Sequence, residues 1–309
     1  MINLTLIVPT HNRHTYLRRS MEYFKNLNAC IIYCDSTEQE FIGELSSNIK
    51  YLHLKGLNFS DKILVALDLA NTDYVALCAD DDFIVIESLY KGVSFLSSNQ
   101  DFKVVVGKYV SFNPIFDNCY YPLYQELPSD INMGLEKNID KFFSNYYQIL
   151  WALYDKVLLT ESFKIIKEGK FYNDNYIELV IGACSCKRGG IKFINDIWGV
   201  RESNSSEHWG DKHFPILNMK IANNHNDFKK FKELVDKVVF EGYAEKIILA
   251  YFKNQNPKIY LFKLYVNKFL GKNLKERIKK IFFTDRKKIS LSSNDLEKLS
   301  KISYVLKKA

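Results

Sequence analysis

Three consecutive carboxylates, Asp80, Asp81 and Asp82, follow the apolar run YVALC at 74–78 and precede further apolar residues. Like charges at the end of a buried strand raise one another's pKa and cost stability unless a cation neutralises them. Mg²⁺ and Mn²⁺ bind carboxylate oxygens and keep coordination sites for phosphate oxygens. The cluster therefore predicts a site for Mn²⁺ or Mg²⁺ carrying a diphosphate. A solvated acidic turn ahead of a helix is the alternative interpretation.

Two other polar segments also follow strand-like runs. PTHNR at 9–13 comes after LTLIV, and DST at 35–37 comes after ACIIYC. In parallel sheets, ligands bind beyond the carboxyl ends of the strands. We therefore expect both segments and the three aspartates to line a single crevice.

The elements that must hold these side chains alternate in type along the first hundred residues. Runs rich in β-branched and aromatic residues lie at 4–8, 29–34, 49–54, 74–78 and 104–110. Helical stretches lie between them, at about 14–27, 61–70 and 87–98. This alternation predicts an α/β fold with a mostly parallel sheet that is covered by helices on both faces.

These segments also carry a family resemblance. LIVPTHNR, YCDST and SDKILVALDLANTDYVALCADDD, in this order and spacing, resemble the nucleotide-sugar half of family 2 glycosyltransferases, which have the GT-A fold. A bacterial subgroup of family-2-like enzymes also places a W-x-V-R-E segment well after CADDDF, here WGVRE at 198–202. The resemblance covers residues 2–112 well and 148–210 more loosely. It implies metal-dependent, inverting transfer of a sugar from a nucleotide-diphosphate donor to a hydroxyl of a bacterial surface glycan, such as capsule or lipopolysaccharide.

For the first two loops, the resemblance implies contacts with the donor. Pro9 and Thr10 would shape the first loop around the nucleotide, and Asn12 and Arg13 would lie near the base or the phosphates. Asp35 matches the family acid that hydrogen-bonds the base or the ribose. Without the family, Thr10 and Asn12 read as turn residues and Arg13 as a solvated charge.

The resemblance extends to the segment that leads into the acidic cluster. Asp61 and Lys62 fall where the family contacts the nucleotide, although Asp61 also suits the first turn of a helix. Asp80 and Asp82 occupy the ends of the DxD motif. The last aspartate is expected to contact the metal and the first the ribose or sugar. Asp81 stays ambiguous, because three aspartates permit two registers.

The second half is expected to supply the acceptor side and the catalytic base. FYNDNYIELVIGACSCKRGGIKFI at 171–194 resembles the family segment in which an acidic pair precedes a helix that ends at a basic-Gly turn, here CKRGG, followed by a strand, here IKFI. The family's Glu-Asp pair is not intact here. An inverting transferase needs a carboxylate to take the acceptor proton. Asp174 is the first choice for this base and Glu178, one helical turn on, is the second. Both also fit as acids that favour a helix N-terminus.

Residues 198–213 hold Arg201 and His208 between two tryptophans, in text that is too polar for a core strand. Arg201 could pair with phosphate oxygens in a forked geometry. His208 could be the late metal ligand that many GT-A enzymes have, although a lone histidine also suits a surface position.

The last sixty residues have a different charge from the rest of the chain. Residues 250–309 hold fourteen Lys and two Arg against four acidic residues, a net +12, so the preceding residues carry −5 of the total +7. NPKIYLFKLYVNKFLGKNLKERIKKIFF at 256–283 predicts a helix with an apolar stripe flanked by lysines. Such a helix suits packing on the catalytic part, and it equally suits an anionic membrane that carries a lipid-linked glycan acceptor. No recognised module accompanies the charge, so nucleic acid is not an expected partner.

Composition limits the remaining classes. The chain is long and apolar enough for a sizeable core, and it shows no basic leader and no stretch of eighteen apolar residues. Six cysteines without CxxC spacing indicate reduced core residues. We therefore expect a cytoplasmic protein, with its C-terminal region as a candidate peripheral contact with the membrane.

The expected organisation is a catalytic domain at 1–214 and a basic helical region at 215–309. The catalytic domain would divide into a nucleotide-sugar half at 1–112 and an acceptor half at 113–214. Two other functions compete with a transferase. A sugar-phosphate nucleotidyltransferase would need a Gly-rich loop after the first strand, which PTHNRHTYLRR lacks. A non-catalytic glycan-assembly subunit with a degenerate site would explain the incomplete Glu-Asp pair.

Overall fold

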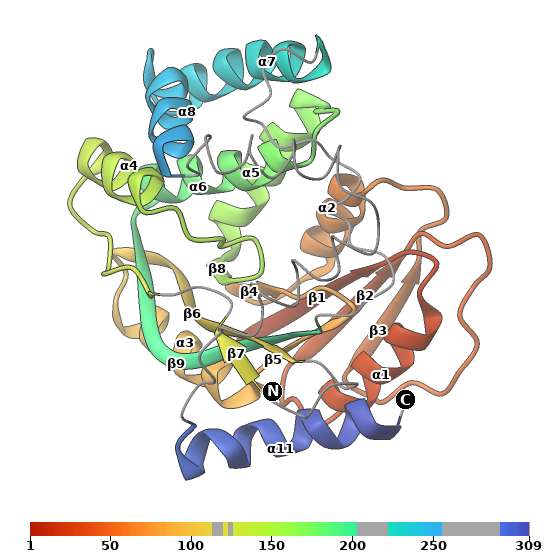
Figure 1. Cartoon of the computed structure of the whole chain (residues 1–309). Helices are drawn as coiled ribbons and strands as arrows, with labels where there is room; N and C mark the ends of the chain where they lie inside the picture. The colour runs from red at the N-terminus through yellow and green to blue at the C-terminus, as the bar shows by residue number, and fades with distance from the viewer. Residues whose placement is uncertain (113–119, 123–125, 203–221, 255–290, 309) are drawn as a thin grey trace, which may run out of the picture.

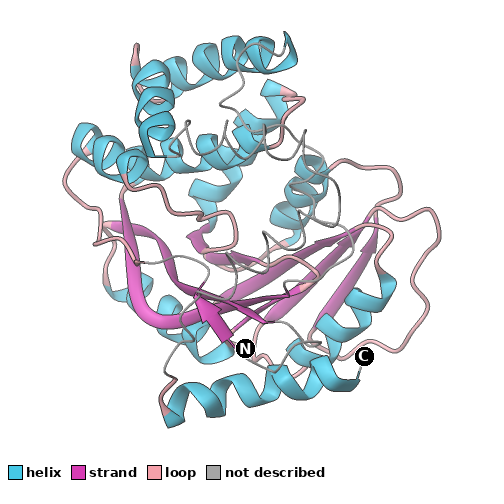
Figure 2. Ribbon diagram, in the orientation of Figure 1, coloured by secondary structure: helices cyan, strands magenta, loops and turns pink. Residues whose placement is uncertain are grey.

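The β-branched and aromatic runs of the sequence form the strands of one curled sheet that lies between layers of helices (Figures 1 and 2). The structure is a computed structural model that describes residues 1–112, 120–122, 126–202, 222–254 and 291–308. The helix predicted at 256–283 and the candidate ligand His208 lie outside these residues.

The strands follow the predicted positions closely in the first half of the chain. They are β1 (Leu4–Thr10), β2 (Cys30–Asp35), β3 (Ile49–His53), β4 (Tyr74–Leu77), β5 (Asp82–Ile84), β6 (Phe102–Phe112), β7 (Tyr120–Pro122), β8 (Leu153–Asp155) and β9 (Gly190–Glu202). Within the described residues, their order across the sheet is β3-β2-β1-β4-β8-β6-β9-β5, and β7 pairs with the outer part of β6.

The directions of the strands determine which strand ends, and so which polar segments, lie together at one edge of the sheet. β3, β2, β1 and β4 are parallel neighbours, and β6 and β9 are also parallel to each other. β8 runs antiparallel between β4 and β6, and β5 runs antiparallel to β9. The carboxyl ends of β1, β2 and β4 therefore meet at one edge of the sheet, as the sequence predicted.

Helices cover both faces of this sheet. They are α1 (His14–Phe24), α2 (Phe59–Leu69), α3 (Ile86–Ser98), α4 (Leu135–Ser144), α5 (Lys156–Gly169), α6 (Asn175–Arg188), α7 (Ala222–Val238), α8 (Tyr243–Asn254) and α11 (Ser293–Lys308). In Figure 1, α2, α5 and α6 lie above the sheet, and α1, α3 and α11 lie below it. The α/β fold predicted from the alternating pattern is confirmed.

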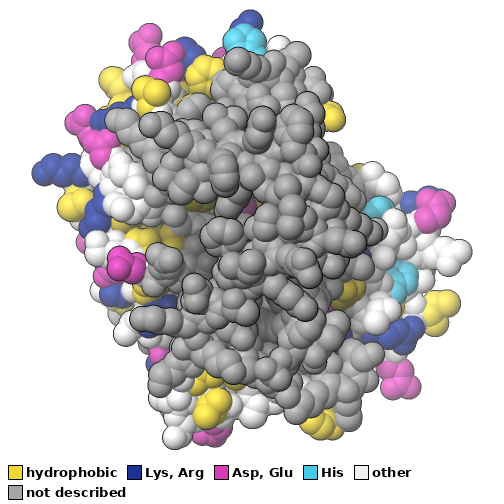
Figure 3. All heavy atoms as spheres, viewed as in Figure 1, with side chains coloured by type: hydrophobic (Ala, Val, Ile, Leu, Met, Phe, Trp, Pro, Cys, Tyr) yellow, Lys and Arg dark blue, Asp and Glu magenta, His cyan; other side chains and the backbone are white. Residues whose placement is uncertain are grey.

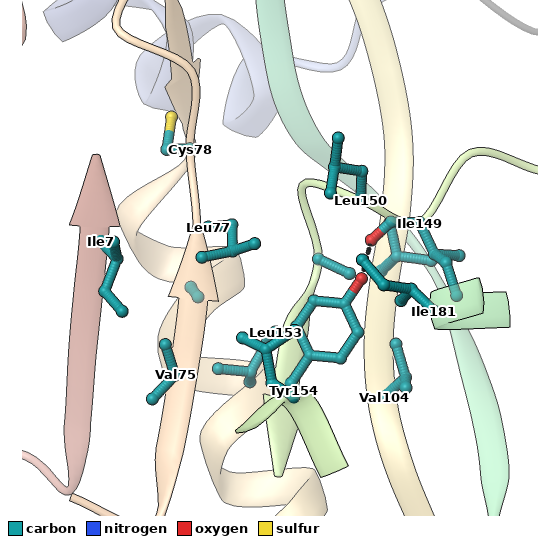
Figure 4. Close-up of a cluster of buried hydrophobic side chains, with 14 of the residues drawn as sticks. Ile7, Val75, Leu77, Cys78, Val104, Ile149, Leu150, Leu153, Tyr154 and Ile181 are labelled. Atoms are coloured by element: carbon teal, nitrogen blue, oxygen red, sulfur yellow. Dashed lines mark hydrogen bonds between the residues drawn. The ribbon is translucent and has the colours of Figure 1, made fainter. Parts of the chain in front are cut away.

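The core fills the space between the central strands and α6. Figure 4 shows Ile7 of β1, Val75 and Leu77 of β4, Tyr154 of β8 and Ile181 of α6 in one cluster. All five side chains are fully buried. This burial on both faces explains why the central strands read as continuous apolar runs rather than alternating ones. The five described cysteines are free thiols, as expected.

The described helices of the C-terminal region pack on two separate parts of the catalytic fold. α7 and α8 lie against α4, α5 and α6, while α11 lies against α1 at the opposite side of the molecule (Figure 1). Lys298 and Lys301 of α11 form ion pairs with Asp196 of β9 and Glu87 of α3. The helical character predicted for this region is present in all three. Each helix among the described residues is too short or too polar to traverse a bilayer.

Candidate active site

Asp80 and Asp81 lie in the turn between β4 and β5, and Asp82 begins β5, at the carboxyl edge of the parallel strands. The side chains of Asp80 and Asp82 are buried: the two residues are 3% and 8% exposed. β5 pairs with β9 so that Asp82 lies opposite Arg201. The alternative interpretation from the sequence was a solvated acidic turn, which would leave these carboxylates in water. In the structure, the carboxylates of Asp80 and Asp82 are buried instead.

Two arginines supply positive charge to the aspartates. Arg13 follows β1 and donates from Nη1 to Asp80 Oδ1 at 2.7 Å and from Nη2 to Asp81 Oδ2 at 2.8 Å. Arg201 places Nε 3.2 Å from Asp82 Oδ2. Thr10 adds a hydrogen bond from its hydroxyl to Asp80 Oδ2 at 2.6 Å. The first loop and the acidic turn, far apart in sequence, thus form one contact network.

The arginines do not fully compensate the burial of the carboxylates. Burial raises the pKa of Asp80 to about 6, although Arg13 lowers it and Asp81 raises it further. Burial raises the pKa of Asp82 to about 7, against the lowering effect of Arg201. Removing carboxylates from water disfavours their charged form. The site is therefore short of positive charge when all three aspartates are ionised.

The described carboxylates of the site are too few to bind a divalent cation without other ligands. Among the described residues, no group of three or more His, Cys, Asp or Glu side chains is arranged to hold a metal by itself. Mg²⁺ is commonly bound through one or two carboxylates together with substrate phosphates. The buried pair of Asp80 and Asp82, with its deficit of positive charge, fits a cation that arrives with a diphosphate.

Asp35 lies at the end of β2 and is fully buried. Its carboxylate accepts hydrogen bonds from His14 Nε2, from the Tyr51 hydroxyl and from the backbone N–H of Thr37, each at 2.8 Å. Burial raises the pKa of Asp35, but the bonds from Thr37, Tyr51 and His14 outweigh it and hold the pKa below its usual value. Asp35 is thus an ionised anchor that fixes the side chains around it.

The side chain of Lys62, in α2, extends to the end of β1, at the edge of the sheet that carries the aspartates. It is 4% exposed, and its Nζ donates to the backbone oxygen of Thr10 at 2.7 Å. Burial lowers the pKa of Lys62, while Cys34, Asp35 and Asp80 raise it. A buried ammonium at this position adds positive potential beneath the first loop.

The first loop turns sharply at Asn12. Asn12 has φ of 57°, a left-handed conformation in which asparagine is enriched, and its N–H donates to Thr37 Oγ1 at 2.8 Å. Pro9 lies within β1 opposite Cys34 of β2. The loop at 9–13 is therefore tied to the segment after β2, as predicted.

Asp61 differs from the other donor-side candidates. Its carboxylate forms an ion pair with Lys167 of α5 at 2.9 Å and accepts from the Asn58 side chain at 2.8 Å. Its backbone N–H donates to Asn58 Oδ1, which caps α2. These contacts match its alternative interpretation as a first-turn helix acid.

On the acceptor side, Asp174 and Glu178 both lie at the start of α6. Asp174 is the residue before the helix, and Glu178 lies in its first turn. Glu178 accepts from the Tyr146 hydroxyl at 2.6 Å and from Gln148 Nε2 at 2.5 Å. Gln148 Oε1 in turn accepts from Arg201 Nη2 at 2.6 Å. Glu178 is thus joined by hydrogen bonds to the arginine that contacts Asp82.

Segment 198–213 starts differently from the prediction, which was wrong to exclude a core strand there. Residues 198–202 are not loop but the end of β9, and Trp198 is fully buried. The strand tolerates Arg201 because Asp82 and Gln148 meet its charge. His14, Tyr51 and Gln148 also contact the site residues and were not predicted from the sequence. Only His14, one residue beyond PTHNR, could have been found from a motif.

Comparison with known proteins adds a family and a fold. Residues 5–156 match the sequence model described as Glycosyl transferase family 2. The crystal structure of S. aureus TarS 1-349 matches with a TM-score of 0.52 at 12% identity, over 81% of this chain and 71% of that one. The structure of S. aureus TarS matches with a TM-score of 0.52 at 15% identity, over 81% of this chain and 43% of that one. No curated protein sequence matches.

Proposed function

We propose that the chain is a glycosyltransferase that uses a nucleotide-diphosphate sugar as its donor, since residues 5–156 match the model of glycosyl transferase family 2. The observation that carries this proposal is the buried cluster of Asp80, Asp82, Arg13 and Thr10 at the carboxyl edge of the sheet. Such an edge is where α/β sheets bind ligands. A cluster short of positive charge suits a cation that arrives with a diphosphate.

Donor binding in this proposal uses the network already described. Arg13 and Arg201 are forked donors that can move from the aspartates to phosphate oxygens. Asp82, with Asp80, would hold Mn²⁺ or Mg²⁺, which neutralises the charge that develops on the departing diphosphate. Asp35, held by hydrogen bonds from His14 and Tyr51, would bind the base or the ribose.

The acceptor hydroxyl needs a carboxylate to remove its proton, and α6 offers two. Asp174 was preferred from the sequence. The contacts in the structure favour Glu178, because hydrogen bonds through Gln148 join it to Arg201, which forms an ion pair with Asp82. Direct attack by the activated hydroxyl on the sugar carbon would invert its configuration, without a covalent intermediate.

The acceptor proposed is a hydroxyl of a bacterial surface glycan, carried on a lipid at the cytoplasmic face of the membrane. The support for this part is the resemblance of the CADDDF and WGVRE segments to bacterial enzymes, together with the +12 charge of residues 250–309. Lysines near an anionic membrane each contribute about 1 kcal/mol to binding.

A panel of nucleotide sugars tests the donor proposal. Each is added with Mn²⁺, and the melting temperature and the release of nucleotide are measured. A true donor at 100 times its dissociation constant stabilises the protein by about 2.7 kcal/mol. Failure of all donors to stabilise the protein, with and without metal, would contradict the proposal.

Asp82→Asn tests the metal. We expect this variant to lose turnover and metal-dependent nucleotide binding while it keeps a cooperative unfolding transition. Wild-type turnover in the variant, together with insensitivity of the wild type to chelators, would exclude the metal site.

A further inference from the structure

A chain of side chains, joined by one ion pair and three hydrogen bonds, crosses the site from the donor carboxylates to α6. It runs from Asp82 to Arg201, Gln148, Glu178 and Tyr146, and we refer to it as the polar chain. Arg201 Nε lies 3.2 Å from Asp82 Oδ2, and Arg201 Nη2 lies 2.6 Å from Gln148 Oε1. Gln148 Nε2 lies 2.5 Å from Glu178 Oε1, and the Tyr146 hydroxyl lies 2.6 Å from Glu178 Oε2. Its two ends are the carboxylate proposed to hold metal and the carboxylate proposed to activate the acceptor.

The amide of Gln148 has a single possible orientation in this chain. A guanidinium can only donate hydrogen bonds, and an ionised carboxylate can only accept them. The amide oxygen must therefore face Arg201 and the amide nitrogen must face Glu178, as observed. A flipped amide would lose both bonds, so the orientation of Gln148 is fixed by its two neighbours.

The backbone around Gln148 is held on both sides. The Tyr147 hydroxyl donates to the backbone oxygen of Gly107 at 2.8 Å. The Tyr154 hydroxyl donates to the backbone oxygen of Ile149, the dashed bond in Figure 4. Trp198 Nε1 also donates to the backbone oxygen of Trp151 at 2.9 Å. Gln148 therefore projects from a segment anchored to β6, β8 and β9.

Arg201 is held equally well. Its position in β9 is set by the register that pairs it with Asp82. Its guanidinium lies over the ring of Tyr109, 4.7 Å from the ring centroid. Two residues earlier, a Cβ at Gly199 would lie 2.5 Å from the Tyr109 ring, so glycine is what lets Tyr109 take this position.

We infer that Gln148 is a positioning residue for the transfer step, which aims Glu178 at the acceptor while it keeps Arg201 from pairing with Glu178. This inference rests on the proposed function. An arginine in direct contact would hold a proton-accepting carboxylate in its charged form and weaken it as a base. The neutral amide orients both groups and separates their charges.

Two substitutions test the role. Gln148→Leu removes both hydrogen bonds, and Gln148→Glu keeps the bond from Arg201 but places a second negative charge beside Glu178. We expect each to lower kcat for sugar transfer about 10- to 100-fold, because small errors in aim are costly. The KM for the donor should stay within about twofold, since the donor contacts are retained.

Tyr147→Phe is the matched control. It loosens the same segment by removing the bond to Gly107 but leaves the polar chain untouched. We expect it to keep kcat within about twofold of the wild type. An equal fall in kcat for Tyr147→Phe and Gln148→Leu, or an unchanged kcat in both Gln148 variants, would overturn the inference.

A second readout does not depend on turnover. The side-chain NH₂ resonance of Gln148, assigned by its absence in Gln148→Leu, is followed by NMR. We expect it to shift in both Glu178→Gln and Arg201→Lys. A resonance that moves in neither variant overturns the polar chain. Absence of donor turnover in the wild type would count against the proposed function, while the resonance would still decide whether the polar chain is formed.

Discussion

Asp80 and Asp82 are carboxylates that the fold keeps from water, and this determines how the protein responds to pH. Their folded-state pKa values are about 6 and about 7, above the unfolded value of about 3.9. Between about pH 4 and 7 the folded state therefore binds more protons than the unfolded state. We expect the free energy of unfolding contributed by this pair to fall as pH rises through that window, which thermal melts across pH will measure.

The variant Asp82→Asn removes the destabilisation that comes from burying the charged carboxylate of Asp82, so it measures that contribution separately from Asp80. We expect its melting temperature at pH 8 to exceed that of the wild type by about 2–4 °C for each kcal/mol gained, with no gain at pH 4. Asp82→Ala is the control, because it adds a cavity at every pH but removes the same charge. A wild type and an Asp82→Asn variant with parallel pH profiles would show that burial does not penalise this carboxylate.

The two carboxylates of α6 make opposite predictions about the base. If Glu178 takes the acceptor proton, Glu178→Gln should lower kcat by about a hundredfold or more, with donor affinity nearly unchanged. Asp174→Asn should then do much less. Single-turnover kinetics with saturating donor will measure both. The reverse order of effects would return the base to Asp174, the choice made from the sequence.

Among the elements, α7 has a role that its place in the sequence does not suggest. Asp227 of α7 is buried, and its carboxylate accepts from the backbone N–H groups of Tyr172 and Asn173 at 3.1 and 2.7 Å. These residues lead directly into Asp174 and α6. A helix from the C-terminal region thus holds the segment that carries both candidate bases.

We predict that Asp227→Ala lowers the free energy of unfolding by about 2 kcal/mol or more, because two buried N–H groups lose a charged partner. It should also lower kcat, while donor binding is retained. Asp236→Ala is the control on the same helix, since Asp236 accepts from Ala244 N–H, away from α6. Equal losses of kcat in both variants, measured beside denaturant unfolding, would mean that α7 acts only on global stability.

Secondary structure was predictable where the residues of a single helix or strand show a hydrophobic pattern typical of that element. β1, β2, β3 and β4 were found because buried runs of β-branched residues are local signals. β8 has three residues and β5 has three, and each depends on a distant partner strand. β9 was predicted only at its start, because its end carries Arg201 and Glu202. β5, β8 and the end of β9 are strands because they pair with residues far away in the sequence, and a local sequence pattern does not show such pairing.

The same limit applies to the candidate site. Asp80, Asp82, Thr10 and Arg13 were found together because each follows a predicted parallel strand. Gln148 follows none, and neither its type nor its spacing sets it apart in the sequence. Its two partners come from α6 and β9, so only the tertiary structure identifies it.

At the scale of the molecule, charge is unevenly divided along the chain. On the face in Figure 3, acidic and basic side chains of described residues alternate around the rim. Of the sixteen basic residues in 250–309, eleven lie outside the described residues. α11, which lies in this region, pairs two of its lysines with Asp196 and Glu87.

We predict that this region binds anionic membrane by charge. Co-sedimentation with anionic vesicles should be strong at low salt and lost at high salt, because the screening length falls from about 30 Å at 0.01 M to about 3 Å at 1 M. Changing Lys268, Lys272, Lys275 and Lys279 to Gln should remove the binding. Neutral vesicles are the control. No binding to anionic vesicles at low salt would leave the lysines as a solvated face.

The sheet order also bears on how the enzyme is made. β4 lies beside β8 rather than beside a strand that follows it closely, and Asp82 finds its partner Arg201 only in β9. A chain still emerging from the ribosome has its acidic turn long before it has the strand that encloses it. Strands this distant in sequence pair slowly, because the entropy of closing the loop is lost before the contacts between them can stabilise the chain. The donor site is therefore among the last parts of the nascent enzyme to assemble, and a chain interrupted before β9 would expose its aspartates without being able to use them.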